Sequence, residues 1–396
     1  DDMTVGGTLG VTGVLTATSL DISGDIDVDG TTNLDVVDVD GAVNFAADVT
    51  FADGADIITA SAGTSNFRAG VNAGNSIVSG GTRNVLIGDE AGTAITTGDY
   101  NVALGYAALD AEDAGSRATA LGYFALSSQN TDTDSYNVAV GFSAGESVTT
   151  GINNTLIGGL AGDAISVGYN NVALGYLSLS ADTKGNNSVA IGRGALENQN
   201  FTSATDSNNT AVGNNAGQAI TTGVSNTLIG AGAGDANTTA SRNTAVGTIS
   251  LSTNTTGAEN TALGYHSLRQ QTTGNRNVSL GDVSMDANTT GSDNVAVGQG
   301  ALTANTTASN NTGIGKSALA ANTTGASNVA AGRRALNANT TGTENVAVGT
   351  DAMYATTTSS RNTALGHAAL DAQTDGTGYN TAVGNNALTT NTSGAY

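Results

Sequence analysis

The chain of 396 residues has no cysteine, no proline and no tryptophan, and only 4% of its residues are aromatic. The absence of cysteine excludes disulfides and thiolate metal sites. The scarcity of aromatic residues argues against a compact globular core. There is no run of about 18 apolar residues, which a membrane helix requires, and Asp1-Asp2-Met3 opens no targeting signal. We therefore expect no membrane insertion.

Basic residues and histidine are also scarce. Lysine and arginine together number 12 against 34 acidic residues, which gives a net charge of −22. Such a chain should repel polyphosphate, so nucleic acid is excluded as a direct partner. The two histidines, His266 and His367, cannot supply a histidine-based triad or a multi-histidine metal site. We expect no enzymatic activity, no catalytic residue, no metal site and no cofactor.

What the chain does contain is a repeat. Asn-Val-Ala-Val-Gly and its variants recur eighteen times between Asn84 and Gly384, and fourteen of the seventeen steps between motif glycines are 17 residues long. This period is too short for a helical hairpin, so one repeat is predicted to form one coil of a stack. We predict an all-β fold, a parallel β-roll or β-solenoid of about eighteen coils, about 85 Å long at the usual strand spacing.

The strand of each coil carries the main expectation about assembly. The residue before the motif glycine is aliphatic in every copy, from Ile87 to Val383, and we expect it to face the interior. The residue before that one is alanine in thirteen copies and is never charged. Because neighbours along a strand point to opposite faces, we predict that this small residue packs against other copies around a three-fold axis. The predicted interface residues are Ala103, Ala139, Ala173, Ala190, Ala296, Ala330, Ala347 and Ala364.

Two further patterns concern the interior of the coil. Where Gly145 stands four residues after the motif glycine, Val148 follows, whereas Leu302 at that position is followed by Asn305. Apolar volume thus moves within single coils, which a conserved core volume demands. It supports two short strands and two turns per coil. The asparagine that opens the motif is present in sixteen of the eighteen copies and predicts an internal asparagine ladder.

The chain divides into three predicted segments. Residues 1–67 carry twelve aspartates and no lysine or arginine, in alternating runs typical of strands, and predict an acidic β-rich stalk or neck. Residues 68–83 are expected to form a junction, and residues 84–396 the solenoid. The chain starts without methionine and ends within a repeat, so we expect a fragment or a processed piece of a longer protein.

The motif resembles a known repeat. Ser188-Val189-Ala190-Ile191-Gly192 and Asn137-Val138-Ala139-Val140-Gly141 are similar to the head repeat of trimeric autotransporter adhesins. The longer coils that end in Asn-Thr-Thr-Gly resemble segments of predicted tail-fibre proteins of marine phages. The resemblance covers about residues 84–396 and implies a left-handed parallel β-roll assembled as a homotrimer. The period is longer than in the adhesins.

From this resemblance we expect a structural segment of a phage tail fibre, located in the virion. It would extend a receptor-binding tip and contribute to host attachment. The implied partners are two further copies of the chain, other virion tail components, and a host cell-surface receptor that is a polysaccharide or a protein. The alternative is the head domain of a trimeric adhesin on a bacterial cell surface.

Other functions are weighed against solvated or structural roles. Asp89-Glu90 and Asp110, Glu112 and Asp113 offer paired carboxylates for glycoside hydrolysis, but solvated turn charge is the simpler interpretation. Asp25, Asp27 and Asp29 alternate on one face, where Ca²⁺ is conceivable. A file of threonines occupies one position in nine consecutive coils, from Thr238 to Thr374, and admits ice binding as an alternative to simple stacking.

Two insertions break the period, at Ser127–Tyr136 and Glu197–Asn208, and add two and four residues. Extra residues in a solenoid must bulge from one face. We therefore select Tyr136 and Phe201 as the candidate contacts to a partner or receptor.

Overall fold

The computed structural model describes residue 12, residues 62–373 and residues 378–392. The chain divides into two units, Asp1–Ile57 and Ile58–Tyr396, and nearly all described residues belong to the second. Apart from residue 12, the predicted acidic stalk up to residue 61, with Asp25, Asp27 and Asp29, lies outside the described residues.

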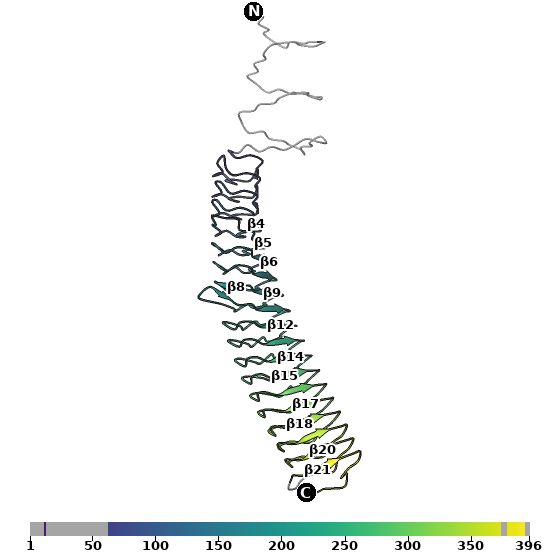
Figure 1. Cartoon of the computed structure of the whole chain (residues 1–396). Helices are drawn as coiled ribbons and strands as arrows, with labels where there is room; N and C mark the ends of the chain where they lie inside the picture. Colours follow the sequence, from purple (N-terminus) through teal and green to yellow (C-terminus); the bar gives the residue numbers. More distant parts are fainter. Residues whose placement is uncertain (1–11, 13–61, 374–377, 393–396) are drawn as a thin grey trace, which may run out of the picture. The chain divides into compact units, whose positions relative to one another are not determined.

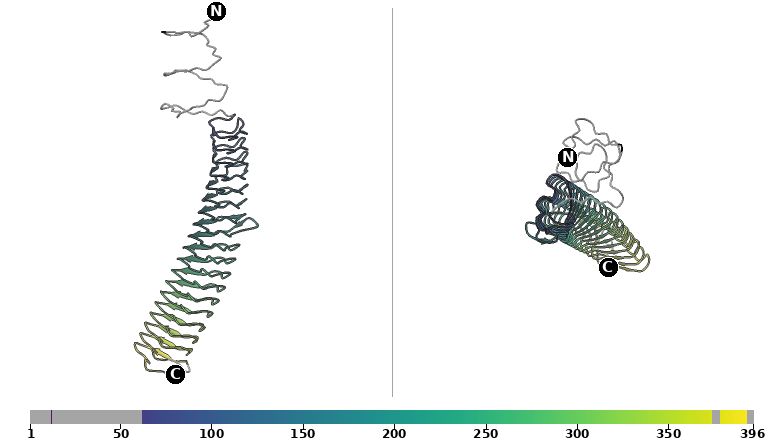
Figure 2. Two further views of the ribbon diagram at one scale, coloured as in Figure 1. Left: turned by 180° about the vertical axis from the view of Figure 1, so that it is seen from behind. Right: turned by 90° about the horizontal axis from the view of Figure 1, so that it is seen from above.

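The second unit is an all-β solenoid, as predicted. Each coil contributes one strand of three residues to a 19-stranded parallel sheet, and the described ranges contain no helix. The strands stack in chain order as a single column (Figures 1 and 2). Their bounds are β1 Phe67–Ala69, β2 Val85–Ile87, β3 Val102–Leu104, β4 Thr119–Leu121, β5 Val138–Val140, β6 Thr155–Ile157, β7 Val172–Leu174, β9 Val189–Ile191, β11 Thr210–Val212, β12 Thr227–Ile229, β13 Thr244–Val246, β14 Thr261–Leu263, β15 Val278–Leu280, β16 Val295–Val297, β17 Thr312–Ile314, β18 Val329–Ala331, β19 Val346–Val348, β20 Thr363–Leu365 and β21 Thr381–Val383.

The register between coils is that of the repeat itself. Each strand residue pairs with the equivalent residue of the next coil, as Ala296 does with Gly313 between β16 and β17. The two insertions leave this ladder intact, because β4 still pairs with β5 and β9 with β11 in register. The second insertion adds a small separate sheet, in which β8 Gly185–Asn186 pairs with β10 Thr205–Asp206.

The solenoid includes residues that we assigned to the junction. Phe67, Arg68 and Ala69 pair in register with Val85, Leu86 and Ile87, and Gly70 has the same positive φ as the later motif glycines. Residues 68–83 therefore belong to a further coil, and the predicted boundary at residue 84 was wrong. The prediction failed because Asn66-Phe67-Arg68-Ala69-Gly70 keeps the asparagine and the glycine of the motif but lacks the usual aliphatic residues between them.

The expectation of two strands per coil was also wrong for the described residues, where a coil has one strand in the main sheet. The rest of the coil consists of turns. Left-handed backbone recurs two and four residues after the motif glycine, as at Ile249 and Leu251. These turns bring the chain back across the coil with hydrogen bonds between neighbouring coils, such as Leu251 N–H to the carbonyl of Ser267 at 3.0 Å.

The core lies on the opposite face of the strand from the one we expected. The middle strand residue points inward and is fully buried, as at Leu86, Ala211 and Ala262, whereas the aliphatic residue before the motif glycine is only partly buried or exposed. Each coil is narrow, and the returning segment places Ala or Ser and then Leu or Met against the strand. A small residue is therefore needed in the strand to fill the coil's own interior at normal packing density.

The exchange of apolar volume within coils is confirmed. Ile95, Val148, Ile165 and Ile220 are buried where the coil has glycine in place of leucine, and Leu302, Leu319 and Leu336 are buried where it does not. In the latter coils the later position holds Asn305, Asn322 and Asn339, which are also fully buried. Asn322 donates to the side-chain oxygen of Asn305 at 3.0 Å. The volume of the interior is thus kept while its polarity changes.

The predicted asparagine ladder is present and bridges successive coils. The side-chain oxygen of Asn243 accepts from the backbone N–H of Asn260 at 2.9 Å, and its Nδ2 donates to the carbonyl of Gly257 at 2.9 Å. Because Asn243 is fully buried, these bonds satisfy groups that would otherwise be desolvated without a partner. The same pair of bonds recurs along the column, with interruptions at Ala118 and Ser188.

Candidate interaction surfaces

The sheet presents an exposed aliphatic face along the solenoid. It is formed by the first and third residues of each strand, and we call it the sheet face. Leu104, Leu263, Ile314 and Leu365 on this face are 45–49% exposed. Their neighbours in the other coils are mostly valine, isoleucine, leucine or threonine. Monomeric proteins rarely leave a continuous apolar row of this length in water, so the sheet face is the candidate for assembly.

The alanines selected as interface residues do not lie on this face. All eight side chains are 0% exposed within a single chain, because they fill the coil interior: Ala103, Ala139, Ala173, Ala190, Ala296, Ala330, Ala347 and Ala364. They cannot contact another copy, so their selection as interface residues was wrong. The candidates are instead the strand residues on either side of each alanine, which form the sheet face. Neighbouring strand residues do point to opposite faces, as expected. However, the aliphatic residue before the motif glycine, which we placed in the interior, lies on the outer face.

The first insertion exposes Tyr136, which is 54% exposed. Its ring lies 5.8 Å from the Arg117 guanidinium carbon, and its hydroxyl donates to Asp134 at 3.3 Å. Arg117 also forms an ion pair with Asp134, which raises the pKa of the guanidinium. Tyr136 is thus available on the surface, in the same column of side chains as Tyr100.

The second insertion does not expose Phe201. This side chain is only 5% exposed, so its selection as a partner contact was wrong. The Phe201 N–H donates to the buried carboxylate of Asp182 at 3.3 Å, while residues 202–204 of the insertion are exposed. An aromatic residue in a four-residue insertion therefore serves to anchor the bulge.

Both insertions are built on a buried carboxylate beside a buried glutamine. Glu112 accepts from Gly115 N–H at 2.8 Å, from Gln129 Nε2 at 2.8 Å and from Thr131 N–H at 3.1 Å. Asp182 likewise accepts from Gly185 N–H at 2.9 Å and Gln199 Nε2 at 2.6 Å. Each arrangement stands next to an interruption of the asparagine ladder. Burial raises the pKa of Glu112, while these hydrogen bonds oppose the rise.

Aromatic side chains form a stacked file that the sequence analysis missed. The rings of Tyr106 and Tyr123 lie 5.4 Å apart, and those of Tyr123 and Phe142 lie 5.3 Å apart, both pairs nearly parallel. Each ring follows directly on a motif glycine, so equal offset from that glycine was the signal. The three side chains are 41–57% exposed, and Glu90 beside Tyr106 raises the pKa of its phenol.

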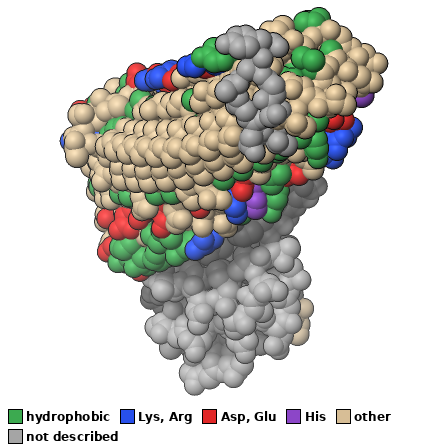
Figure 3. Space-filling view, turned by 90° about the horizontal axis from the view of Figure 1, so that it is seen from below, with side chains coloured by type: hydrophobic (Ala, Val, Ile, Leu, Met, Phe, Trp, Pro, Cys, Tyr) green, Lys and Arg blue, Asp and Glu red, His purple; other side chains and the backbone are tan. Residues whose placement is uncertain are grey.

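Charges on another file alternate in sign. Arg242 pairs with Glu259 at 2.7 Å, Arg276 with Asp293 at 2.7 Å, and Arg361 with Glu344 at 2.8 Å. All six occupy the position before the ladder asparagine, where the backbone is left-handed. Figure 3 shows charged side chains along the borders of rows of uncharged atoms that repeat from coil to coil. Exposed pairs of this kind contribute little to stability because water and salt screen them.

The residues weighed for catalysis differ in their surroundings. Glu112 is buried and bonded as above, Asp113 is exposed and accepts from Thr96, and Asp110 is partly buried, which raises its pKa. His266 stacks on Tyr265 with ring centres 3.8 Å apart, and His367 is exposed on another coil. No cluster of three or more histidine, aspartate or glutamate side chains that could hold a metal occurs in the described ranges.

The threonine file bonds to the backbone of the next coil. Thr255, Thr272 and Thr289 each donate a hydroxyl to the carbonyl of the equivalent threonine at 3.0–3.1 Å. These side chains are half-buried. A hydroxyl that is bonded internally is less able to order water, so the file serves stacking. Thr374 lies outside the described residues.

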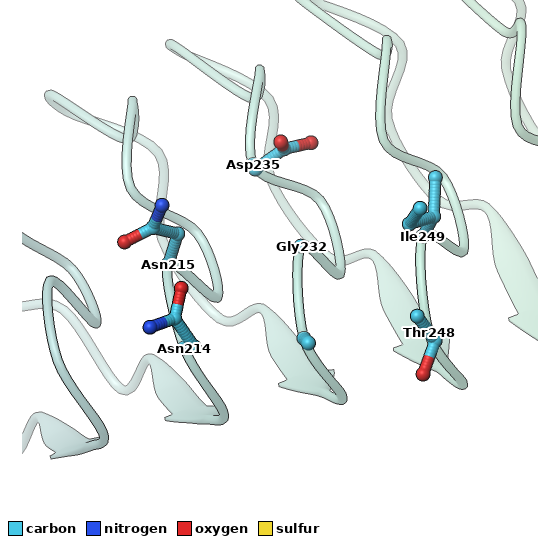
Figure 4. A pocket seen from close by; sticks show the side chains of 7 residues that line it. Asn214, Asn215, Gly232, Asp235, Thr248 and Ile249 are labelled. Carbon is cyan, nitrogen blue, oxygen red and sulfur yellow. The ribbon is translucent and has the colours of Figure 1, made fainter.

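One hollow opens on the turn side of β12 and its neighbouring coils. It has a volume of about 280 Å³ and is lined by Asn214, Asn215, Ala231, Gly232, Asp235, Thr248 and Ile249. Figure 4 shows the side chains of three successive coils around Gly232, with Asp235 on the turn above it. Burial raises the pKa of Asp235, and its Oδ1 has no hydrogen-bond partner.

Comparison with known proteins gives no family assignment. No family model, no curated protein and no solved structure matches the chain. Within the described ranges, no helix is long and apolar enough to cross a membrane.

Proposed function

We propose that this chain is the shaft segment of a homotrimeric attachment fibre, of the tail-fibre type, which holds a receptor-binding tip away from the virion. The observation that carries the proposal is the sheet face. It runs along the solenoid with exposed aliphatic side chains at the spacing of the coils, for example Leu263, Ile314 and Leu365 at 45–49%.

The occupant that fits this face is another copy of the same chain. Its side chains repeat once per coil, and only a solenoid with the same coil spacing can match them along the whole length. A closed ring of identical chains buries the face in every coil. The resemblance to trimeric head repeats supports three copies. The partners beyond the trimer are then the virion tail components at one end and the host receptor at the tip.

A shaft acts through its length, so whole coils should be dispensable. Deleting residues 265–332 removes four complete coils and joins Gly264 to Arg333 in register. We expect the fibre to assemble, to be about 20 Å shorter by electron microscopy, and to retain host attachment. The control deletion of residues 265–272 removes part of one coil and should disrupt the stack.

Loss of attachment by an assembled, shortened fibre would contradict the shaft proposal. It would favour the adhesin alternative, in which the coils themselves contact the host. The exposed Tyr106, Tyr123 and Phe142 lie outside the deleted coils, so their contribution is not removed by this test.

A further inference from the structure

The hollow at Gly232 exists because one coil lacks a side chain that its neighbours have. The position two residues after the motif glycine holds Asn215 in the preceding coil and Ile249 in the following one. At Gly232 a Cβ would meet no atom nearer than 3.7 Å. The absence of a side chain there leaves a gap one coil high between Asn215 and Ile249 (Figure 4).

The backbone at this position does not require glycine. Asn215, Ile249 and Leu160 occupy the equivalent position with φ of 55–56°, close to the 63° of Gly232. The fold therefore accepts a large side chain at this position, because other coils already place non-glycine residues there in left-handed backbone. Gly232 creates space and is not needed to form the turn.

A carboxylate borders this gap; the equivalent Gly194 also has one beside it, Glu197, but there Asn215 Oδ1 lies 2.7 Å from the place of a Cβ and occupies the space. Asp110, Asp163, Asp235 and Asp371 occupy one position in their coils, and burial raises the pKa of all four. In the other three coils the position three residues earlier holds a side chain, which is Ala107, Leu160 or Ala368. At Asp235 it is Gly232, and Oδ2 lies 3.7 Å from where a Cβ would be.

The remaining walls combine donors, acceptors and an apolar surface. The Oδ1 of Asn215 accepts from Arg193 Nη1 at 3.3 Å in the preceding coil, which leaves its Nδ2 hydrogens as donors at the wall. Asn214 and Thr248 add an amide and a hydroxyl, and Ile249 and Ala231 add apolar contact area. Few convergent polar groups on a partly apolar wall are typical of small-molecule sites.

These groups select a neutral, hydroxyl-rich ligand. Asp235 and the net charge of −22 repel an anion. A single carboxylate with amide and hydroxyl neighbours is a weak donor set for a divalent cation, which prefers several charged oxygens. Hydroxyl groups can both donate to a carboxylate and accept from amides, and the C–H face of a sugar ring can pack on Ile249. The volume of about 280 Å³ accommodates one hexose unit.

We propose that the hollow around Gly232, Asp235 and Ile249 is a binding site for one neutral hexose residue of a glycan. The site adds a lateral contact to the shaft and is independent of a receptor-binding tip. It is open and shallow, so affinity for a single residue is expected on the order of 1 mM.

The test is titration of the full chain with the methyl glycosides of glucose, galactose and mannose, followed by saturation-transfer NMR. We expect saturable binding of at least one glycoside to the wild-type chain. Gly232→Leu fills the hollow and should abolish binding. Gly300→Leu is the matched control, because Gly300 has φ 66° at the same position of another coil but lies beside Thr303 in place of an acid.

A second pair of variants tests the carboxylate. Asp235→Asn should weaken binding at least tenfold, whereas Asp163→Asn, at the same position of another coil, should leave it unchanged. The proposal is overturned if no glycoside binds the wild-type chain saturably, or if Gly232→Leu, shown to be folded by circular dichroism, binds as the wild type does. Neither result bears on the number of chains in the assembly.

Discussion

At the scale of the residue, the motif glycine is the least replaceable position. Gly264 has φ 133°, and a Cβ there would lie 2.6 Å from the carbonyl oxygen of Gly281 in the next coil. This backbone region is essentially restricted to glycine, and the contact adds a clash with the main chain. Because successive coils approach closely at this position, the motif ends in glycine in all eighteen copies.

We predict that Gly264→Ala destabilises the chain by more than about 2 kcal/mol. Gly300→Ala is the control, since its φ of 66° is left-handed backbone that other residues adopt in these coils and the nearest atom to a Cβ is 3.4 Å away. Denaturant unfolding of both variants measures the difference. Equal midpoints would show that the glycine is not required by the backbone.

The ladder asparagines make the second prediction at this scale. Asn243→Ala leaves the buried Asn260 N–H without its acceptor and removes one of two donors to the carbonyl of Gly257, which Asn254 Nδ2 also reaches at 2.8 Å. We expect a loss of about 1–3 kcal/mol in the free energy of unfolding. Gln299→Ala removes an exposed amide and should change it by less than about 0.5 kcal/mol. Similar losses in the two variants would mean that the ladder contributes little.

Residue-level features were predicted unevenly by the sequence. The ladder and the exchange between Leu302 and Asn305 followed from spacing alone, because both are properties of one position repeated many times. The inward face of the strand was assigned wrongly, since both faces are apolar in sequence. Only the narrowness of the coil, set by the returning turn, decides that Ala296 is inside and that Val297 is not.

At the scale of the coil, the position five residues after the motif glycine carries a partly buried aspartate in several coils, and burial disfavours its charged form. Burial is the main cause that raises the pKa of Asp163, and Glu146 beside it adds to the rise. The folded chain then holds this proton more tightly than the unfolded chain does. The resulting stabilisation is present below the ordinary Asp value of 3.8 and is lost as pH rises through the folded-state pKa.

We predict that the melting temperature of the wild type, relative to that of Asp163→Asn, is highest near pH 4 and falls toward pH 7. Asn337 occupies the same position in another coil, so the amide fits. Thermal unfolding of both chains across this range measures the trend. A relative melting temperature that rises with pH would show that the folded chain favours the charged carboxylate.

The coil as a unit was predictable in its period and only partly in its path. The 17-residue spacing indicated stacking in register, and the pairing of Val295 with Thr312 confirms it. The second strand that we expected does not form in the described coils, because the returning segment has left-handed backbone at alternate residues, as at Ile249 and Leu251, and a strand cannot contain it. The first coil was missed because Phe67-Arg68-Ala69 lacks the aliphatic pattern while keeping the glycine at its end.

At the scale of the whole solenoid, the decisive feature is the sheet face. The described unit stacks its coils in one column (Figure 2), so any apolar row on one face extends with it. Lysine at the predicted interface residues Ala296, Ala330 and Ala347 would not test assembly, because these side chains fill the interior of one chain. Lysine there would unfold a monomer as readily as an oligomer, so it cannot distinguish the two.

The substitutions that distinguish them are Leu263→Lys, Ile314→Lys and Leu365→Lys, all on the exposed sheet face. Combined in one chain, they should leave each coil's interior unchanged and place three charges per chain between copies, where unpaired charge is costly. Lysine at the exposed Thr239, Thr273 and Gln299 is the control, and it should not affect assembly.

Sedimentation equilibrium of the wild type and of these two variants decides between assembly and a solitary chain. For the wild type and the control variant we predict a mass of three times the 38.7 kDa chain. For the sheet-face variant we predict a single chain or loss of folded structure. A wild-type protein that is folded and stable at 38.7 kDa would contradict the homotrimeric fibre.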